Sequence, residues 1–413
     1  MHKRWTLIAM PKIDLQEYRQ SEPVSLSLTE LNALKAKELS LTITPTGDAE
    51  GTYYLTPSST VGALEVGDLS VLIEPKIGIP QLLSLACYAI DKVEFQREQF
   101  DFPDEYALPD VLALALASAA RRAFTCGLLH GYRMKEEELY TVRGRIRFDE
   151  QIRCRFGIPL PIEVRYDEFT DDILANRLVK AAAYRLGRMR LYSGKARTDL
   201  GWVAGMLDNV SLIAFPPKDV PEIKFDRLNA HYREVIALSQ LILRHNAYEA
   251  DRGKVRTSGF LMDMNKVFQE FVTVALREAL GLNERTFRES SICSLDEAGR
   301  VHLRPDLTWW DGSDCTFVGD AKYKRIENQQ VPNADLYQLL AYVAALGLPG
   351  GMLIYAKGEA KPVVHKIRHS DKRLEVAALD LSGSLDEILA RVRCLAEQVR
   401  ALRDEARGLR RAA

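Results

Sequence analysis

A predicted β-hairpin near the carboxyl-terminal third constrains this chain of 413 residues more than any other feature. Segments 303–310 and 315–324 are rich in β-forming residues, and the Asp-Gly-Ser-Asp sequence between them, at 311–314, is a strong turn signal. Folding one strand onto the other about Gly312 and Ser313 puts Asp306 opposite position 319, within one residue of Asp320. Two carboxylates are therefore expected to be neighbours across the hairpin.

The second strand of this hairpin carries Asp320-Ala321-Lys322, and its period of two puts Asp320 and Lys322 on one face. Neighbouring carboxylates repel each other unless a cation lies between them. Their oxygens suit Mg²⁺, which also keeps waters and binds substrate phosphate oxygens. The pattern predicts a metal-dependent phosphodiesterase: Asp306 and Asp320 bind the metal, the Ala321 carbonyl completes its shell, and Lys322 orients the attacking water. A surface hairpin with exposed ion pairs, each worth about 0–1 kcal/mol, is the alternative.

Helices predicted on both sides of the hairpin favour the enzymatic interpretation. Residues 261–279 have an amphipathic pattern, and Glu270 on this helix is available as a further acidic group, a metal ligand or general base. Residues 335–342 predict a second helix that places Gln338 and Tyr342 at i and i+4 on one face. Glu270 could instead be a solvated residue, and the other two could be ordinary helix contacts. The apolar side of the first helix consists of Val267, Phe268, Phe271, Val272 and Leu276.

The order of these elements, a helix, a hairpin with D…DxK and a helix with QxxxY, resembles that of PD-(D/E)XK nucleases of the RecB-like type. Phrases elsewhere resemble the McrC family, the nuclease subunit of McrBC-type modification-dependent (type IV) restriction systems. The resemblance identifies Asp306, Asp320 and Lys322 with that family's catalytic residues. Gln269 stands where the family pattern has an acidic residue, which leaves any acidic role there to Glu270. The phrases are Val66-Gly67-Asp68, Ile73-Glu74-Pro75-Lys76-Ile77, Arg143-Gly144-Arg145-Ile146, the stretch from Tyr166 to Asp172, Asn176-Arg177, and the stretch from Met262 to Val272.

This resemblance implies an endonuclease subunit that works with a hexameric GTP-hydrolysing AAA+ partner of the McrB type. The partner would recognise modified cytosine in double-stranded DNA, and residues 1–80 of this chain would dock on the ring and stimulate its GTPase. The implied cofactor is Mg²⁺, with Mn²⁺ as a substitute. The chain has no G-x-x-x-x-G-K-[ST] sequence, so a nucleotide motor would be another polypeptide.

Composition favours a cytoplasmic protein without a membrane span. The net charge is −1, and 47% of residues are hydrophobic and 27% charged, as in soluble globular proteins. The longest apolar runs, near 82–90 and 111–120, are shorter than the roughly 20 residues that cross a bilayer. The six cysteines lie far apart without a C-x-x-C pair, so neither a zinc site nor a disulfide framework is expected.

Basic side chains cluster at two places and are candidate phosphate contacts, although interspersed acids also fit a solvated face. The first cluster is Arg121, Arg122, Arg133, Arg143, Arg145, Arg147, Arg153 and Arg155, and the second is Lys322, Lys324, Arg325, Lys366, Arg368, Lys372 and Arg373.

The predicted fold class is α+β multidomain, because the length exceeds what one core usually covers. Residues 1–80 predict a small β-rich module, with strands at 39–44, 51–56 and 70–73. Residues 81–250 predict a mainly helical middle region, with helices at 110–128, 172–188 and 228–245 and a β-like segment at 140–148.

Residues 251–382 are predicted to form the α/β PD-(D/E)XK nuclease domain, with the loop 246–258 as its boundary. Residues 383–413 predict a terminal helix whose apolar stripe, from Leu385 to Leu409, has heptad spacing. The stripe could pair with another chain or pack on its own domain.

Two other functions stay open on the sequence. The chain could be a non-catalytic activator of an AAA+ GTPase with a structural core, or a stand-alone RecB-like repair nuclease. The intact D…DxK set disfavours the first, and the McrC-like phrases outside the core disfavour the second.

Overall fold

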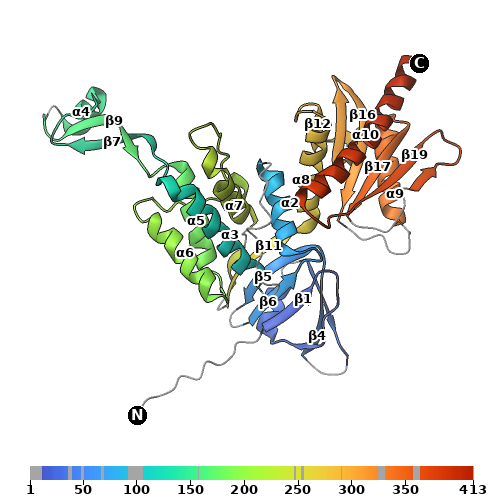
Figure 1. Ribbon diagram of the computed structural model, residues 1–413, viewed down its shortest axis with the longest axis horizontal. Coiled ribbons are helices and arrows are strands. Elements are labelled where there is room, and N and C mark those ends of the chain that lie inside the picture. Colours follow the sequence, from blue (N-terminus) through green and yellow to red (C-terminus); the bar gives the residue numbers. More distant parts are fainter. Residues whose placement is uncertain are drawn as a thin grey trace, which may run out of the picture. The chain divides into compact units, whose positions relative to one another are not determined.

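The computed structural model describes residues 12–35, 40–47, 51–66, 69–91, 106–156, 158–245, 248–252, 255–289, 291–323, 331–356 and 363–412 (Figure 1). The chain divides into two compact units. Residues up to 101 and residues from 248 onward form the first unit, and residues 102–247 form the second. The amino-terminal module and the carboxyl-terminal region, predicted as separate domains, therefore belong to one unit.

The first unit contains a five-stranded sheet built from two segments far apart in the chain, residues 12–74 and 248–263. The pairing of the two segments depends on Gly62 of one strand, because a Cβ atom there would lie 2.0 Å from the carbonyl oxygen of Phe260 on the paired strand. The boundary loop predicted at 246–258 is wrong for its described residues, since they form strands that long-range pairing specifies and local composition does not reveal. In sheet order the strands are β1 (Lys12–Gln16), β6 (Leu69–Glu74), β5 (Thr60–Val66), β11 (Val255–Asp263) and β10 (Tyr248–Arg252).

A three-stranded sheet and a short helix cover the first sheet. The helix, α1 (Leu28–Leu34), begins with a capping box between Ser27 and Glu30. Leu31, Leu34 and Leu55 join residues of β1, β5 and β6 in one apolar core. The strands predicted at 51–56 and 70–73 are confirmed, as is the described part of 39–44; Leu39 lies outside the described residues. The sheet order is β2 (Val24–Ser25), β4 (Thr52–Pro57) and β3 (Leu41–Pro45), and α2 (Ile79–Asp91) follows β6 in the chain.

A six-stranded sheet carries the predicted hairpin. Its central strands β16, β17 and β19 are parallel, and every residue of β17 is buried, as expected for a strand covered on both faces. In sheet order the strands are β12 (Phe287–Glu289), β15 (Leu307–Asp311), β16 (Asp314–Lys322), β17 (Gly350–Ala356), β19 (Arg373–Leu379) and β18 (Val363–Lys366), with β13 (Cys293–Ser294) and β14 (His302–Leu303) paired separately.

Three helices pack on this sheet: α8 (Met264–Ala279), α9 (Asn333–Ala345) and α10 (Leu385–Ala412). The predicted apolar side of α8 is confirmed as buried. The helix starts later than predicted because 261–263 belong to β11 and Asp263 caps the helix by accepting a hydrogen bond from the Asn265 amide. The stripe of α10 packs on its own domain, where Val392, Val399 and Leu402 are buried.

The second unit is mainly helical, as predicted. Its longer α-helices are α3 (Leu108–Ala123), α5 (Leu174–Gly187), α6 (Gly194–Met206) and α7 (Arg233–His245), with 3₁₀ turns η3 (Phe124–Cys126), η4 (Pro217–Asp219) and η5 (Ala230–Tyr232). Among the described residues of both units, no helix is long and apolar enough to span a bilayer.

The second unit also contains a sheet of order β7 (Gly131–Leu139), β9 (Ile162–Thr170) and β8 (Arg145–Ile146), with α4 (Phe148–Arg155). Residues 131–170 are called the projection here, because β7, β9 and α4 extend away from the helices of this unit (Figure 1). The sequence indicated only a β-like segment at 140–148. Strand β7 escaped notice because no residue of it is buried, which removes the alternating apolar pattern that marks a strand.

Candidate active site

The hairpin brings Asp306 and Asp320 level through a β-bulge. Near the turn, Trp310 is opposite Cys315, but beyond the bulge between Trp309 and Trp310 the register shifts, and Leu307 is opposite Gly319. Asp306, which precedes Leu307, is therefore level with Asp320, and the prediction that it lies opposite position 319 is wrong by this one residue. A bulge adds one residue to one strand and leaves no compositional sign, so reflection about the turn could not include it.

Asp320 is a buried carboxylate whose oxygens accept no hydrogen bond from a neutral donor among the described residues. Only 1% of it is exposed, and neither of its side-chain oxygens accepts a hydrogen bond of ordinary geometry within the described part of the chain. The Lys322 ammonium lies 2.6 Å from one of these oxygens as an ion pair. Asp306 accepts a hydrogen bond from the Ala321 amide at 3.1 Å. A buried charge without hydrogen bonds is costly unless cations offset it, so this donor set fits a metal ion in addition to Lys322.

Burial and neighbouring charges shift the pKa values of Asp306 and Lys322. Burial, and then the neighbouring charge of Asp320, raise the pKa of Asp306 to about 8, although the Ala321 amide and Lys322 oppose this. Burial lowers the pKa of Lys322, but the charges of Asp320, Asp306 and Asp335 outweigh it, so the net pKa of Lys322 is raised. Asp306 therefore holds a proton at neutral pH, and Lys322 stays charged. A site that retains a proton between two carboxylates lacks positive charge.

The sequence interpretation did not include Asp335. This residue lies buried in the first turn of α9 and accepts a hydrogen bond from the Tyr355 hydroxyl at 2.8 Å. Tyr355 is opposite Lys322 in the parallel β16–β17 pair, and Asp335 helps to keep that lysine charged. The sequence spacing could have indicated that Asp335 lies at the site, because Asp335, Gln338 and Tyr342 recur at i, i+3 and i+7 on one helical face.

Gln338 and Tyr342 support the backbone next to Asp306. The Gln338 amide donates to the Tyr342 hydroxyl at 2.6 Å, which in turn donates to the Arg304 carbonyl at 3.2 Å. Burial and the charge of Asp320 raise the pKa of Tyr342, so its hydroxyl stays a neutral donor. Both residues thus lie at the site, where they hold the segment that leads into Asp306.

Glu270 has a different environment. It lies on α8, one turn after Lys266, with which it forms an ion pair at 3.6 Å. Within the described ranges, no three His, Cys, Asp or Glu side chains are grouped so that they could hold a metal ion. Asp306 and Asp320 therefore form a pair without a third carboxylate ligand here, and the role of Glu270, like that of the Ala321 carbonyl, stays a prediction.

Several residues of the basic clusters have intramolecular partners. Arg121 pairs with Asp199 at 2.8 Å, and Arg122 pairs with Glu234 at 2.6 Å. Lys372 donates to the Leu348 carbonyl at 2.8 Å. These contacts favour the paired-surface interpretation for those positions, while Lys324 and Arg325 lie outside the described residues.

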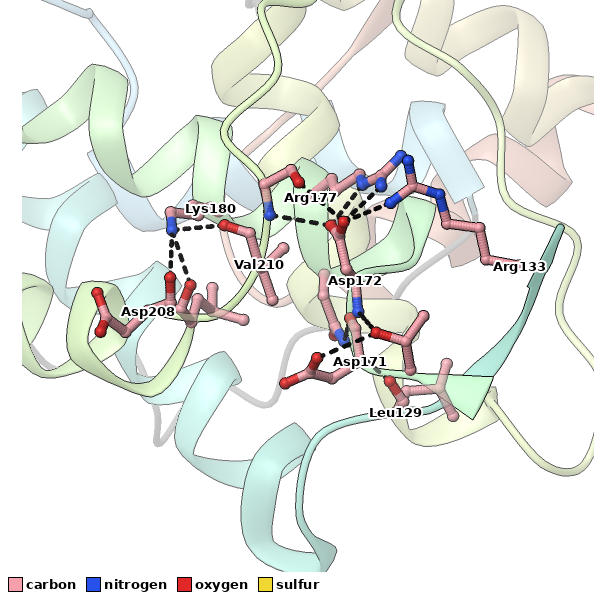
Figure 2. Close-up of polar contacts among 12 residues, drawn as sticks. Leu129, Arg133, Asp171, Asp172, Arg177, Lys180, Asp208 and Val210 are labelled. Atoms are coloured by element: carbon pink, nitrogen blue, oxygen red, sulfur yellow. Dashed lines mark hydrogen bonds and ion pairs between the residues drawn. The ribbon is translucent and has the colours of Figure 1, made fainter. Parts of the chain in front are cut away.

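A second polar centre anchors the projection to the helices of its unit (Figure 2). The Asp172 carboxylate accepts hydrogen bonds from Arg133 of β7 at 2.6 Å, from Arg177 of α5 at 2.6 and 2.7 Å, and from Ser211 at 2.8 and 2.9 Å. The hydrogen bond from Arg177 is the largest cause of the lowered pKa of Asp172. Asn176 donates to the carbonyls of Leu129 and Asp171, which adjoin the two strands where they meet the helices. The phrases from Tyr166 to Asp172 and Asn176-Arg177 thus build the base of the projection.

The projection itself exposes large apolar side chains. Phe156 at its α4 end is 91% exposed. Soluble proteins rarely expose many such side chains together unless another surface covers them, so the projection is a candidate contact surface. Its exposed large apolar residues are Tyr132, Met134, Tyr140, Val142, Phe148, Ile152, Phe156, Ile158, Leu160 and Phe169.

Comparisons with known proteins agree with the family resemblance of the sequence. A family model described as "McrBC 5-methylcytosine restriction system component" matches residues 55–356. The type IV methyl-directed restriction enzyme EcoKMcrBC of Escherichia coli (strain K12) is 24% identical over 268 residues, which cover 60% of this chain and 76% of that protein.

Two solved structures are similar to this chain. One is a half-complex from a tetradecameric assembly of Thermococcus gammatolerans McrB AAA+ hexamers with bound McrC. It has a chain that matches with a TM-score of 0.58 and 18% identity, covering 94% of this chain and 100% of that chain. A chain of the Thermococcus gammatolerans McrBC complex matches with a TM-score of 0.43 and 21% identity over 67% of this chain and 89% of that chain. At these identities the first match shows a shared mixed α/β fold.

Proposed function

This chain belongs to the family of McrBC 5-methylcytosine restriction system components, and from that premise we propose that it is the system's Mg²⁺-dependent DNA endonuclease subunit. The observation that carries the proposal is the pair of the buried Asp320 and the half-buried Asp306, level across the hairpin, with Lys322 2.6 Å from Asp320. We assign this centre to a PD-(D/E)XK nuclease domain within residues 251–382. An ordinary surface hairpin would not bury a carboxylate such as Asp320 beside a half-buried carboxylate and lysine.

In the proposed centre, Asp306 and Asp320 hold the ion, and the Ala321 carbonyl is a further ligand. Mg²⁺, or Mn²⁺ as a substitute, supplies polarisation of the phosphoryl group and an acidified water when bound. A site with two carboxylates suits Mg²⁺, because this ion keeps several waters and needs few protein ligands. The hydrogen bond between Asp306 and the Ala321 amide keeps one carboxylate in place.

Lys322 contributes a fixed positive charge. Its raised pKa keeps it protonated, so its ammonium can orient the attacking water or balance the negative charge that grows on the phosphate in the transition state. Gln338 and Tyr342 position the Asp306 segment, and Asp335 helps Lys322 to stay charged. The burial of these groups limits competing water around them.

We propose a hexameric AAA+ GTPase of the McrB type as the partner, because a solved assembly to which this chain is similar contains McrB AAA+ hexamers with bound McrC. This partner would recognise modified cytosine in double-stranded DNA. The sequence suggested residues 1–80 as the docking region, but exposed large apolar side chains are far more concentrated in residues 131–170. The projection is therefore the better-supported docking surface.

Plasmid cleavage tests this function. Methylated and unmethylated plasmids are incubated with Mg²⁺ and wild-type or Asp306→Ala protein, with and without the AAA+ partner and GTP. Cleavage that needs methylation, partner, GTP and Asp306 is expected. Cutting by the chain alone regardless of methylation would support the stand-alone repair nuclease, and no cutting with preserved GTPase stimulation would support the non-catalytic activator.

A further inference from the structure

The strand that carries Asp320 and Lys322 ends against the amino-terminal module. Tyr323, the next residue, is 4% exposed, and its ring centroid lies 6.1 Å from that of Phe268. Its carbonyl accepts a hydrogen bond of 3.4 Å from the Tyr18 hydroxyl, across 305 positions of sequence. Its own hydroxyl lies beside the Glu17 carboxyl. The end of the proposed catalytic strand is thus attached to the turn that follows β1.

Glu17 is an unusual residue to find at this contact. It is 2% exposed, and one carboxyl oxygen accepts a hydrogen bond from the Lys76 amide at 3.2 Å. The other oxygen and the Tyr323 hydroxyl lie near each other without ordinary hydrogen-bond geometry to any described residue. Burial raises the pKa of Glu17 to about 7. Two buried polar groups with incomplete partners destabilise a fold relative to apolar residues of similar size, so packing alone does not account for them.

Tyr18 is held in place from several sides. Its backbone has a φ of 58°, in the left-handed region that is costly for a residue with a bulky side chain. Its amide donates to the Pro57 carbonyl at 3.0 Å, and the Lys76 ammonium lies 4.0 Å from its ring centroid. Lys76 belongs to the phrase Ile73-Glu74-Pro75-Lys76-Ile77, which the proposed chemistry leaves without a role.

The position of Lys322 gives these contacts their importance. Lys322 and Tyr355 are the last pair of the β16–β17 ladder, and strand ends open more readily than strand centres. The contacts of Tyr323 hold the chain one residue beyond that pair. The ion pair with Asp320 holds the Lys322 side chain from within the strand, and the contacts of Tyr323 add an anchor beyond the end of the ladder.

We propose that Glu17, Tyr18 and Lys76 form with Tyr323 a latch that positions Lys322, which makes the amino-terminal sheet a positioning part of the nuclease site. This inference rests on the proposed function. Tyr323→Phe removes only the buried hydroxyl, and Glu17→Gln replaces the titratable carboxyl by a neutral amide of similar size. Tyr88→Phe is a matched control, because Tyr88 is also a buried tyrosine of the first unit and its hydroxyl bonds the Glu278 carboxylate.

The first arm of the test is single-turnover DNA cleavage by the complete complex. Tyr323→Phe and Glu17→Gln should each slow cleavage about tenfold without changing the DNA concentration for half-maximal rate, whereas Tyr88→Phe should not. The double variant should be no slower than the single variants, because the two groups act as one unit. Rates equal to that of Tyr88→Phe, or additive losses, would overturn the latch.

The second arm does not need cleavage. Hydrogen exchange is measured on the full chain, for a peptide that includes the amides of Lys322 and Tyr323. Both latch variants should exchange there about tenfold faster than Tyr88→Phe. Unchanged protection would overturn the latch even if the wild type cut no DNA, an outcome that would separately refute the proposed nuclease function.

Discussion

The carboxyl-terminal sheet and the projection break the usual rule of burial in opposite directions. The sheet buries Asp320 and most of Lys322, although charged side chains are rarely found inside proteins. The projection leaves Phe156, Tyr140 and Tyr132 in solvent, although large apolar side chains usually pack in a core. Each departure costs stability unless something outside the chain compensates it: a cation in the first case and a protein surface in the second.

The two regions suit different tasks: the carboxyl-terminal sheet suits catalysis and the projection suits binding. In the proposed function the carboxylate pair acts on a phosphodiester with a bound metal ion, whereas the exposed apolar residues of the projection only bind a partner. Substitutions in the sheet should therefore abolish cleavage and leave partner binding intact, and substitutions in the projection should do the reverse.

The largest expected effect is on cleavage by Lys322→Ala. In the proposed mechanism the ammonium balances charge in the transition state, so its removal should lower the cleavage rate about 10³-fold, in the range seen for lost electrostatic stabilisers. Stimulation of the partner GTPase should remain at the wild-type level. Loss of both activities together would show that folding or docking, and not catalysis, had failed.

Asp172→Ala should have the next largest effect, on stability rather than chemistry. It leaves Arg133 and Arg177 without their shared carboxylate, so the free energy of unfolding should fall by about 2–3 kcal/mol. Chemical denaturation at pH 7 measures this change, with the exposed Asp208→Ala as the control. The lowered pKa of Asp172 means that its contribution is present above about pH 4 and is lost as the pH falls further, so the difference should shrink in acid.

Phe156→Ser should weaken partner binding without destabilising this chain. The side chain is 91% exposed, so its loss should leave the melting temperature within error, while the dissociation constant for the AAA+ ring should rise about tenfold, equivalent to about 1.4 kcal/mol. Leu28→Ser, an exposed site in the amino-terminal module, serves as the control. Equal binding by wild type and Phe156→Ser, with weakened binding by Leu28→Ser, would contradict docking by the projection and support docking by residues 1–80.

The smallest predicted effect is a pH-dependent stabilisation by metal. The pKa of Asp306 is about 8 in the folded chain and about 4 when unfolded, so stability from its proton is complete below about pH 4 and declines as the pH rises toward about 8. Mg²⁺ replaces that proton, and should raise the melting temperature about 2 °C more at pH 8 than at pH 6. Thermal scans of wild type and Asp320→Asn measure this, and a pH-independent shift in the wild type would count against the pair.

The sequence predicted which polar residues of the sheet lie together better than it predicted the strand register that brings them there. Asp306, Asp320 and Lys322 were found because a turn signal and a period of two are local properties. The bulge at Trp309 and Trp310, the entry of β11 into the amino-terminal sheet and the contact of Tyr323 with Glu17 depend on residues far apart in sequence, and no local pattern specifies them. The binding of a metal and the catalytic roles of Asp306, Asp320, Lys322 and their neighbours are still predictions.

The projection was largely missed for the opposite reason. Sequence patterns detect strands through buried alternation, and β7 has no buried residue, so its pairing with β9 left no periodic sign. The base of the projection was visible only as the phrases from Tyr166 to Asp172 and Asn176-Arg177, whose hydrogen bonds the structure explains. Elements that add little to a buried core are the ones that core-based reasoning overlooks.

Calorimetric titration of Mn²⁺ into the wild type and into Asp320→Asn, each in two buffers with different ionisation heats, tests the central claim most directly. At pH 7 the wild type should bind the ion and release a proton, because Asp306 is protonated without metal. Asp320→Asn should lose most of the affinity, and a smaller loss in Glu270→Gln would make Glu270 a further ligand. Equal binding by the wild type and Asp320→Asn, or binding without proton release, would contradict the assignment of the carboxylate pair as the metal centre.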